Sequence, residues 1–341
     1  MLKPYIAKVI NGQNLSAQEA KEAMDIIMTG QATQAQIGGY LVALRMKGET
    51  VDEITGSVRT MREQVARVPV TLADGEPLLD TAGTGGDGSH SFNISTAAAF
   101  IIAGAGRKVA KHGNRAASSR CGSADVLMAL GVSMELTPEQ VGQCIDEVGI
   151  GFMFAPKFHP AMKHAIGPRR ELGQRTIFNV LGPLTNPAGA THQLIGVYDP
   201  ALTEPLAEVL RELGCDGALV IHGHGGMDEL TTAGPNRVSH LRNGSVSTYE
   251  LRAADYGLRA ACDDDVSGGD PEDNARKMRA LLSSKEQNPC RDVVLFNAAA
   301  ALALTTGNFN TALSEATQSL DSGAALQKLD ALVEMSQSLA A

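Results

Sequence analysis

Residues 78–111 read LLDTAGTGGDGSHSFNISTAAAFIIAGAGRKVAK, and this stretch predicts a strand, a glycine-rich loop, a helix and a second strand. The apolar residues of Leu78–Asp80 suit a short strand, Ser95–Ala105 suits a buried helix, and Lys108–Lys111 suits the next strand. Two strands that are connected through a helix lie parallel in a sheet. The stretch therefore predicts an α/β fold with a mainly parallel central sheet.

The same alternation continues toward the C-terminus. It predicts helices at Ser123–Leu130, from Thr137 with its capping partner Gln140, and at Thr203–Leu213, and strands at Gln193–Val197 and Ala218–His222. Two apolar segments near the end, Val293–Leu304 and Ala312–Leu320, suit buried helices. The polar, glycine-rich stretch 263–273 predicts an exposed loop.

Before residue 73 the pattern predicts helices only. Three capping boxes open these helices: Ser16 with Glu19, Thr33 with Gln36, and Thr50 with Glu53. The segment Phe158–Pro187 is rich in proline, glycine, arginine and histidine, and suits an irregular or helical return to this lobe. We therefore predict a small all-helical domain over residues 1–72, with a mid-chain return at about 157–190, and a larger α/β domain over residues 73–341.

Composition excludes several classes of function. The chain of 341 residues has a net charge of -9, which argues against general binding to nucleic acid or to anionic membranes. The apolar stretch Ala97–Ala105 is too short to cross a membrane, and the N-terminus lacks the long apolar run of a signal peptide. The five cysteines form no CxxC pair, so we expect reduced thiols and a cytoplasmic protein.

The loop at residues 80–88, DTAGTGGDG, predicts an anion site. Its glycine amides can form a nest for a phosphate, and the helix that starts near Ser95 attracts negative charge. Gly83, Gly85 and Gly88 also fit the dinucleotide pattern GxGxxG, but the helix does not open at the loop and no acidic residue follows about 20 positions later. A simple tight turn is the alternative for the glycines alone.

Two other loops follow predicted strands. Lys111–Arg115, KHGNR, offers a cation and neutral hydrogen-bonding side chains for a phosphate and a polar ring substituent. His222–Glu229 ends in the adjacent carboxylates Asp228 and Glu229, which can share Mg²⁺ with substrate phosphates. No matching Cys/His set accompanies the histidines of this loop, so we interpret them as structural rather than as zinc ligands. Arg169 can clamp a carboxylate. A solvated surface position is the alternative for each of these residues.

Six runs of residues resemble those of anthranilate phosphoribosyltransferases, in the same order and along nearly the whole chain. They are DTAGTGGD at 80–87, FNIST at 92–96, KHGNRA at 111–116, GSAD at 122–125, RTIFN at 175–179 with LGPLTNP at 181–187, and GDP at 269–271. The resemblance implies a small helical domain against a larger α/β domain, a homodimer through the helical domains, Mg²⁺ as cofactor, and a role in tryptophan biosynthesis. It implies no nucleic-acid or membrane partner.

The resemblance also implies which residues bind each substrate. Phosphoribosyl pyrophosphate is expected at Gly83, Thr84, Gly85, Gly86, Asp87, Asn93, Ser95, Thr96, Lys111 and Ser123, and anthranilate at Gly83, His112, Asn114, Arg169, Gly182 and Pro183. The implied metal ligands are Asp228, Glu229 and Ser95. No residue is assigned as a certain catalytic group, and Asn114, Lys111 and His112 are expected to position the reacting groups.

The implied reaction is a displacement at C1 of the ribose, with positive charge developing on the sugar ring. Mg²⁺ and the loop amides would stabilise the departing pyrophosphate, and the neutral aromatic amine needs no obligatory base. Two rival functions remain. A pyrimidine nucleoside phosphorylase shares the general architecture but has a different glycine loop and lacks the KHGN run. A non-catalytic relative that binds nucleic acid conflicts with the net charge of -9.

Overall fold

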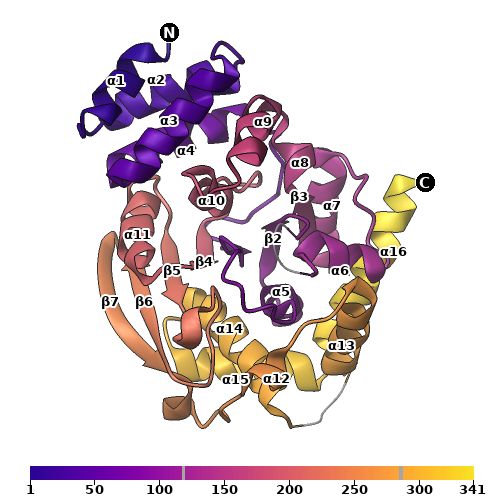
Figure 1. Cartoon of the computed structure of the whole chain (residues 1–341). Helices are drawn as coiled ribbons and strands as arrows, with labels where there is room; N and C mark the ends of the chain where they lie inside the picture. Colours follow the sequence, from indigo (N-terminus) through magenta and orange to yellow (C-terminus); the bar gives the residue numbers. More distant parts are fainter. Residues whose placement is uncertain (117–119, 284–286) are drawn as a thin grey trace.

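The computed structural model describes residues 1–116, 120–283 and 287–341. A group of helices near the N-terminus lies at one end of the molecule, and a sheet with helices on both faces makes up the rest (Figure 1). The buried apolar residues form two clusters. One cluster joins the N-terminal helices to one face of the sheet, and the other packs α5 and α14 against the opposite face. The predicted fold class is confirmed.

The N-terminal group contains α1 (Lys3–Ile10), α2 (Ala17–Met28), α3 (Gln34–Lys47) and α4 (Val51–Gln64). All three predicted capping boxes form, at the starts of α2, α3 and α4. We did not predict α1, which has no capping side chain at its start. The absence of that signal explains the omission, because a short helix without a cap has little to mark it in the sequence.

The mid-chain segment was predicted to be irregular or helical, and it is helical. It contains α8 (Ala155–Phe158), α9 (Lys163–Leu172) and α10 (Phe178–Leu181), with 3-10 turns at Pro160–Met162 and Gly182–Leu184. Helix α9 packs against α2 and α3, and α10 packs against α4. The chain therefore returns to the N-terminal helices, while the domain division at residue 72 stays a prediction.

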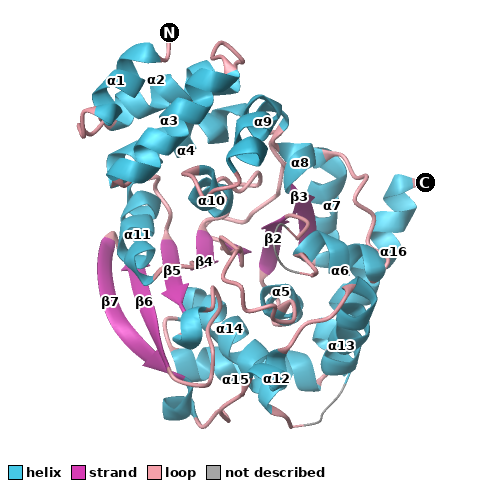
Figure 2. Cartoon of the chain, viewed as in Figure 1, coloured by secondary structure: helices cyan, strands magenta, loops and turns pink. Residues whose placement is uncertain are grey.

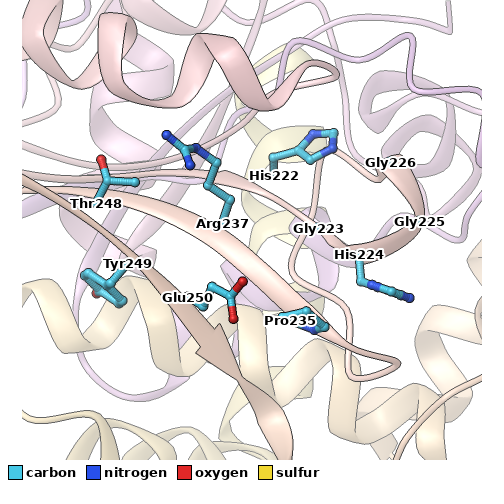
Figure 3. A pocket seen from close by; sticks show the side chains of 10 residues that line it. All are labelled: His222, Gly223, His224, Gly225, Gly226, Pro235, Arg237, Thr248, Tyr249 and Glu250. Atoms are coloured by element: carbon cyan, nitrogen blue, oxygen red, sulfur yellow. The ribbon is translucent and has the colours of Figure 1, made fainter.

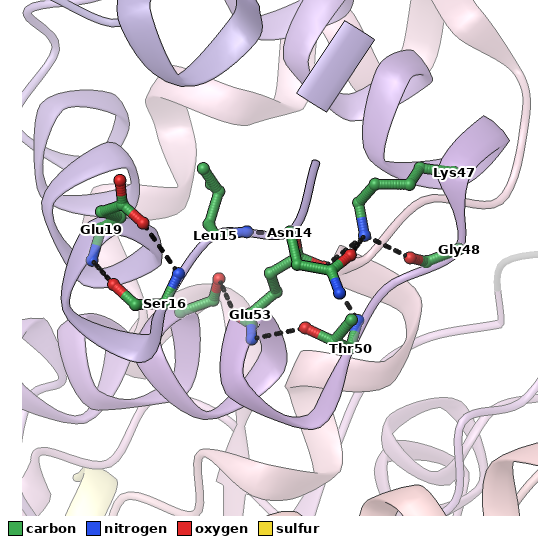
Figure 4. Close-up of polar contacts among 9 residues, drawn as sticks. Asn14, Leu15, Ser16, Glu19, Lys47, Gly48, Thr50 and Glu53 are labelled. Carbon is green, nitrogen blue, oxygen red and sulfur yellow. Dashed lines mark hydrogen bonds and ion pairs between the residues drawn. The ribbon is translucent and has the colours of Figure 1, made fainter. Parts of the chain in front are cut away.

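Polar groups are also buried within the N-terminal helices, around Glu53 (Figure 4). One carboxylate oxygen of Glu53 accepts a hydrogen bond from the Leu15 amide at 2.9 Å. The other accepts from the Thr50 amide at 2.8 Å and from Lys47 Nζ at 2.9 Å. Because both oxygens are satisfied, the buried charge is tolerated and ties three segments of the bundle together.

The sheet has seven strands in the order β3-β2-β1-β4-β5-β6-β7 (Figure 2). They are β1 (Leu78–Asp80), β2 (Lys108–Gly113), β3 (Ile150–Phe154), β4 (His192–Gly196), β5 (Gly217–His222), β6 (Pro235–Arg242) and β7 (Ser245–Arg252). Neighbours from β3 to β5 pair in parallel, whereas β6 and β7 are antiparallel. The mainly parallel sheet is confirmed, but we did not predict β3 or the β6–β7 hairpin.

Helix α5 (Ile94–Gly104) is enclosed by other elements. Nine of its side chains are buried, which is the pattern of a central helix rather than an amphipathic one. It packs against α14 (Pro289–Thr306), α15 (Phe309–Asp321) and α16 (Ala324–Ala340). A Cβ at Gly104 would collide with Ser319 Oγ, so this glycine permits the close approach of α15. The helix that follows the glycine-rich loop is therefore held firmly.

The outer helices of the α/β part are α6 (Ser123–Ala129), α7 (Pro138–Val148), α11 (Thr203–Glu212), α12 (Asp263–Val266) and α13 (Pro271–Ser283). The stretch 263–273 is mostly exposed, as predicted, but the prediction of a loop is wrong, because the stretch contains α12 and the start of α13. Its acidic residues cap the starts of the two helices: Asp265 accepts from the Cys262 amide, and Asp270 accepts from the Asp273 amide.

All five cysteines are free thiols, as predicted. Among the described residues, no helix is long and apolar enough to cross a membrane.

Candidate active site

Three loops meet at the carboxyl edge of the parallel strands. The glycine-rich loop follows β1, the second loop follows β2, and the loop that carries Asp228 and Glu229 follows β5. Asp228 Oδ2 accepts a hydrogen bond from the Gly85 amide at 2.7 Å, and Glu229 Oε1 accepts from the Ser95 amide at 3.0 Å. Residues about 140 positions apart in the sequence are thus in direct contact at this edge.

Two glycines make room for Asp228. A Cβ at Gly83 would lie 2.6 Å from Asp228 Oδ2, and a Cβ at Gly196 would overlap the Asp228 carbonyl oxygen. Gly85 and Gly86 serve a different purpose, because their φ angles of 65° and 76° lie in the left-handed region. The glycines of this loop are therefore required partly by close approach and partly by backbone conformation.

Carboxylates gather at the meeting point of the loops. The Asp228 amide donates to Asp87 Oδ2 at 3.3 Å, and Ser91 Oγ donates to Glu229 Oε2 at 3.2 Å. Burial, followed by the charge of Asp87, raises the pKa of Asp228, while burial and the charge of Asp228 raise the pKa of Glu229. A cation would relieve this repulsion.

The donor set fits Mg²⁺ better than a metal that requires an all-protein cage. In the described ranges, no three His, Cys, Asp or Glu side chains are arranged to hold a metal ion by themselves. Hard oxygen ligands from one or two carboxylates, completed by substrate phosphates and water, are the arrangement that Mg²⁺ commonly adopts in phosphate sites. Asp228 and Glu229 could hold the ion here, with Ser95 beside them.

Lys111 lies deep under the glycine-rich loop. Its Nζ donates to the Thr81 carbonyl oxygen at 2.8 Å and to Thr81 Oγ1 at 3.2 Å. Burial lowers the pKa of Lys111 to about 8, and burial raises the pKa of its neighbour Asp80 to about 6. Asp80 accepts from the His112 amide and from Asn186 Nδ2. We did not single out Asp80, although a carboxylate at the end of an apolar strand was a usable signal.

Two buried histidines form a pair. His112 Nε2 and His159 Nε2 are 3.2 Å apart, so one ring donates and the other accepts. Burial lowers the pKa of His112 to about 3 and the pKa of His159 to about 4, so both rings are neutral at pH 7. The strand β2 extends through His112 and Gly113, so the second loop starts later than predicted. His159 was not among the predicted site residues.

Asn114 and Ser123 are joined at the end of β2. The Asn114 carbonyl oxygen accepts from the Ala124 amide at 3.1 Å and from Ser123 Oγ at 3.3 Å. Asn114 Oδ1 accepts from the Arg115 amide at 2.8 Å, which turns the chain. Thr96, one turn into α5, is buried, and its hydroxyl has no hydrogen-bond partner among the described residues.

Arg169 lies on α9, in the segment that returns to the N-terminal helices. Its guanidinium stacks over the Phe178 ring at 5.2 Å, and burial lowers its pKa. Within the described ranges it makes no ion pair. Gly182 and Pro183 form the 3-10 turn after α10, where the Pro183 carbonyl oxygen accepts from Gln193 Nε2. The half-buried Arg169 is thus available to pair with an anionic ligand.

Comparison with known proteins agrees with this geometry. Residues 75–326 match the α/β domain of a glycosyl transferase family, and residues 3–65 match its helical bundle domain. The chain is 56% identical to the anthranilate phosphoribosyltransferase of Moorella thermoacetica, over 100% of both chains. It is 52% identical to that of Acetivibrio thermocellus, over 99% of this chain and 97% of the relative. The chain belongs to the anthranilate phosphoribosyltransferase family.

Solved anthranilate phosphoribosyltransferases share the whole fold. The enzyme from Thermus thermophilus superposes with a TM-score of 0.92 at 44% identity, covering 97% of this chain and 99% of its own. The Saccharomyces cerevisiae enzyme, solved in complex with PRPP and Mg, gives a TM-score of 0.91 at 29% identity, covering 99% and 98%. The architecture is therefore that of the anthranilate phosphoribosyltransferase family from end to end.

Arg175 is a further residue of this family member that we did not assign to the site. Its Nη2 donates to the Gly86 carbonyl oxygen, and its guanidinium lies 4.0 Å from the centre of the Tyr198 ring. It therefore links the segment after α9 to the glycine-rich loop. Its position in the RTIFN run was the available signal, but the sequence does not show which way an arginine points.

A cavity of about 530 Å³ lies beside the third loop, outside the meeting point of the carboxylates. Figure 3 shows His222 at the end of β5, His224 on the loop that follows, and Arg237 and Glu250 on the strands of the hairpin. His222 Nδ1 lies 2.8 Å from the Val197 carbonyl oxygen, so this ring is held by the backbone. Glu250 pairs with Arg252. In this member of the anthranilate phosphoribosyltransferase family, the cavity is separate from the predicted substrate residues.

Proposed function

We propose that the chain transfers the phosphoribosyl group of phosphoribosyl pyrophosphate to the amine of anthranilate, giving phosphoribosylanthranilate and pyrophosphate in tryptophan biosynthesis. One observation carries the proposal: the carboxylates of Asp228 and Glu229 lie against the amides of Gly85 and Ser95. A glycine-rich loop beside a helix N-terminus suits phosphate, and adjacent carboxylates suit a metal that phosphates also bind. A magnesium-bound polyphosphate matches both at once.

The donor site consists of the glycine-rich loop, the start of α5 and the end of β2. The residues proposed to contact phosphoribosyl pyrophosphate are Gly83, Thr84, Gly85, Gly86, Asp87, Asn93, Ser95, Thr96, Lys111 and Ser123. The left-handed glycines Gly85 and Gly86 turn the loop, and the N-terminus of α5 supplies a favourable dipole. In an acidic protein, these local devices explain how a polyanion can bind.

Asp228 and Glu229 are proposed to hold Mg²⁺, with Ser95 as a further ligand. The bound ion supplies charge neutralisation for the pyrophosphate oxygens when they leave. Their raised pKa values follow from burial and from like charges placed together, which is the arrangement expected of ligands awaiting a cation. The Saccharomyces cerevisiae relative was solved with PRPP and Mg, which supports the same cofactor here.

The acceptor site is proposed between Asn114, His112, Arg169 and the turn at Gly182–Pro183, with Gly83 at its border. Arg169 has no anionic partner among the described residues and would bind the carboxylate of anthranilate. His112 is neutral and its Nε2 is engaged by His159, so it forms a wall for the aromatic ring instead of a second cationic site. Asn114 would orient the amine.

In the proposed reaction, the bond between C1 of the ribose and the pyrophosphate oxygen breaks while the bond between C1 and the anthranilate nitrogen forms. The electron pair of the broken bond leaves with pyrophosphate, and the amine nitrogen then loses a proton. Loop amides and Lys111 offset the charge that grows on the leaving group, and Mg²⁺ held by Asp228 and Glu229 would add to this. Positioning of the two substrates accounts for the rest of the rate enhancement.

The decisive experiment mixes the purified protein with anthranilate, phosphoribosyl pyrophosphate and Mg²⁺ and follows the loss of anthranilate fluorescence. A decay that requires Mg²⁺ supports the proposal. Tight binding of the donor without decay would indicate a different nucleophile. Phosphorolysis of thymidine or uridine would favour the nucleoside phosphorylase alternative, and a salt-dependent gel shift would favour a nucleic-acid-binding relative.

We further propose a cytoplasmic homodimer that forms through the helical domain. Four large apolar side chains are exposed on its helices: Ile10 on α1 (67% exposed), Val42 and Met46 on α3 (38% and 84%) and Ile166 on α9 (46%). Exposed apolar groups of this size favour burial in an interface. Light scattering after gel filtration should give twice the chain mass, and Met46→Glu should shift the protein toward monomer. A wild-type monomer at micromolar concentration would contradict the dimer.

A further inference from the structure

A segment from the C-terminal half runs along the end of the glycine-rich loop. We name residues 262–274, which contain α12 and the start of α13, the α12–α13 strap (Figure 1). The Phe92 amide donates to the Val266 carbonyl oxygen at 2.7 Å, and the Gly268 amide donates to the His90 carbonyl oxygen at 2.8 Å. A Cβ at Gly268 would lie 2.6 Å from the Ser91 carbonyl oxygen. The strap therefore pairs closely with residues 90–92.

Asn274 connects this strap to Asn93. The Gly269 amide donates to Asn274 Oδ1 at 2.7 Å, and Asn274 Nδ2 donates to Asn93 Oδ1 at 2.9 Å. Asn93 Nδ2 in turn donates to the Cys121 carbonyl oxygen at 3.1 Å. Asn274 is 1% exposed, so water does not compete for these bonds. Three segments of the chain are thus joined through two side-chain amides.

The direction of both amides follows from the backbone groups at the two ends. A backbone N–H can only donate, so the Asn274 atom that faces Gly269 must be its oxygen and the atom that faces Asn93 must be its nitrogen. A backbone carbonyl can only accept, so the Asn93 atom that faces Cys121 must be its nitrogen. Both ends require the same assignment, so the usual ambiguity between amide oxygen and nitrogen does not arise.

The arrangement determines what Asn93 can offer to a ligand. Its oxygen is occupied by Asn274 and also lies 3.5 Å from Cys121 Sγ. Its nitrogen carries two hydrogens, and in the described part of the chain only the Cys121 carbonyl oxygen accepts from it. The remaining hydrogen is a donor, which suits the anionic oxygens of a phosphate or pyrophosphate.

We propose that Asn274 is a positioning residue, which holds the amide of Asn93 so that its N–H is directed to the phosphoribosyl pyrophosphate. This inference rests on the proposed function, because it assigns Asn93 to the donor site. Asn274 itself touches neither substrate and acts through Asn93. The strap thereby makes donor binding depend on a residue 181 positions further along the chain.

The test replaces Asn274 by aspartate, which keeps the shape of the side chain and still accepts from the Gly269 amide. Asp at this position cannot donate to Asn93 Oδ1, so the Asn93 amide must turn its nitrogen toward residue 274. Its oxygen then faces the Cys121 carbonyl oxygen and the donor phosphate. We expect Asn274→Asp to raise the KM for phosphoribosyl pyrophosphate by about tenfold to a hundredfold, the loss typical of one hydrogen bond to a charged group. The KM for anthranilate, measured with saturating donor, should change by less than about twofold.

Asn236→Asp is the matched control. Asn236 is also a fully buried amide that bonds to backbone groups at both ends, the Thr231 amide and the Leu251 carbonyl oxygen. It lies in β6, and its side-chain hydrogen bonds in the described part of the chain go to Thr231, Gly234 and Leu251, so it reports the cost of burying a carboxylate. We expect it to lower the melting temperature while the donor KM stays unchanged. A similar rise in donor KM in both variants would overturn the proposal.

A double-mutant cycle separates a positioning role from a general structural one. In an Asn93→Ala background, Asn274→Asp should add less than about twofold to the donor KM, because its effect passes through Asn93. A full additional effect in that background would overturn the proposal. If Asn274→Asp does not fold, Asn274→Ala avoids the buried charge, and its donor KM should rise at least about threefold and only when Asn93 is present.

The proposed function and this inference fail in different ways. Absence of phosphoribosyl transfer by the wild-type protein would overturn the function, and the inference with it. Normal wild-type transfer together with an unchanged donor KM in Asn274→Asp would overturn the inference alone. Equal increases in the KM values of both substrates would also reject it, since a positioning role through Asn93 affects the donor selectively.

Discussion

A methyl group at residue 83 would collide with the carboxylate of Asp228. The Cβ of a Gly83→Ala variant would lie 2.6 Å from Asp228 Oδ2, a distance that real Cβ atoms essentially never show. The φ angle of Gly83 is outside the left-handed region in which glycine is required. The substitution therefore tests the space that Gly83 leaves for Asp228 without backbone strain. Because Gly83 also borders both proposed substrate sites, the Mg²⁺ requirement is the readout that is specific to Asp228.

The size of the effect follows from the distances. Ordinary van der Waals contact begins near 3.4 Å, so the methyl group and Asp228 must separate by about 0.8 Å. That displacement breaks the 2.7 Å hydrogen bond from the Gly85 amide. A misplacement of about 1 Å in a reacting constellation can cost about a hundredfold in rate. We expect kcat/KM to fall by about 30- to 100-fold, with a higher Mg²⁺ concentration needed for half-maximal activity.

The assay follows anthranilate fluorescence at saturating phosphoribosyl pyrophosphate while Mg²⁺ is titrated. Gly39→Ala is the control, because a Cβ at Gly39 meets no atom within 4 Å and the residue lies inside α3. This control should keep full activity and gain up to about 1 kcal/mol of stability from better helix propensity. If Gly83→Ala retains kcat/KM within about twofold and an unchanged Mg²⁺ requirement, the idea that Gly83 positions Asp228 is refuted.

Four further outcomes are expected. The double variant Asp228→Asn with Glu229→Gln should abolish both the activity and the calorimetric binding of Mg²⁺ in the presence of donor, and an unchanged metal titration would reject these residues as ligands. Arg169→Ala should raise the KM for anthranilate by about tenfold to a hundredfold but leave the donor KM within about twofold, and an equal rise in both would contradict its role. Glu53→Ala should reduce the free energy of unfolding in urea by about 3 kcal/mol. The buried Leu15 amide and the half-buried Thr50 amide lose their acceptor, and Lys47 loses its ion pair and keeps only its bonds to Asn14 and Gly48. A loss below about 1 kcal/mol would contradict that reasoning. Burial lowers the pKa of His159 to about 4 from its ordinary value of 6.5, so the unfolded chain binds protons first as the pH falls, and the free energy of unfolding decreases from about pH 6.5 toward pH 4. In urea denaturation, the free energy of unfolding of His159→Gln should decrease less steeply over this pH range. Equal slopes in the variant and the wild type would argue against a buried neutral ring.

The sequence signals that succeeded were local ones. The capping boxes at Thr33 and Thr50 specify their own helix starts, because both partners lie within one turn. The strand Leu78–Asp80 followed by glycines and an alanine-rich helix specifies a crossover unit for the same reason. The β6–β7 hairpin escaped prediction because β7 is mostly exposed and polar, so no apolar alternation marks it.

From the sequence, residues could be placed together in the site only where they follow the carboxyl ends of predicted parallel strands. Asp228 and the glycine-rich loop were both expected at the carboxyl edge of the sheet, and the structure brings them into contact. His159 and Arg175 were missed because they come from the irregular return segment, where no periodicity indicates which way a side chain points. Asn274 was missed because its stretch resembled a solvated loop, and its burial depends on long-range pairing with residues 90–92.

The enclosure of α5 has a consequence for how donor binding and folding are linked. Amides in a helix that is buried on every side exchange with deuterium only when the whole domain opens. The interior of α5 is therefore expected in the slowest-exchanging part of the chain, and the proposed donor residues lie at the half-buried start of the same helix. A ligand that binds there stabilises the entire domain by mass action. Deuterium uptake in α5 should thus fall with donor concentration in parallel with global protection.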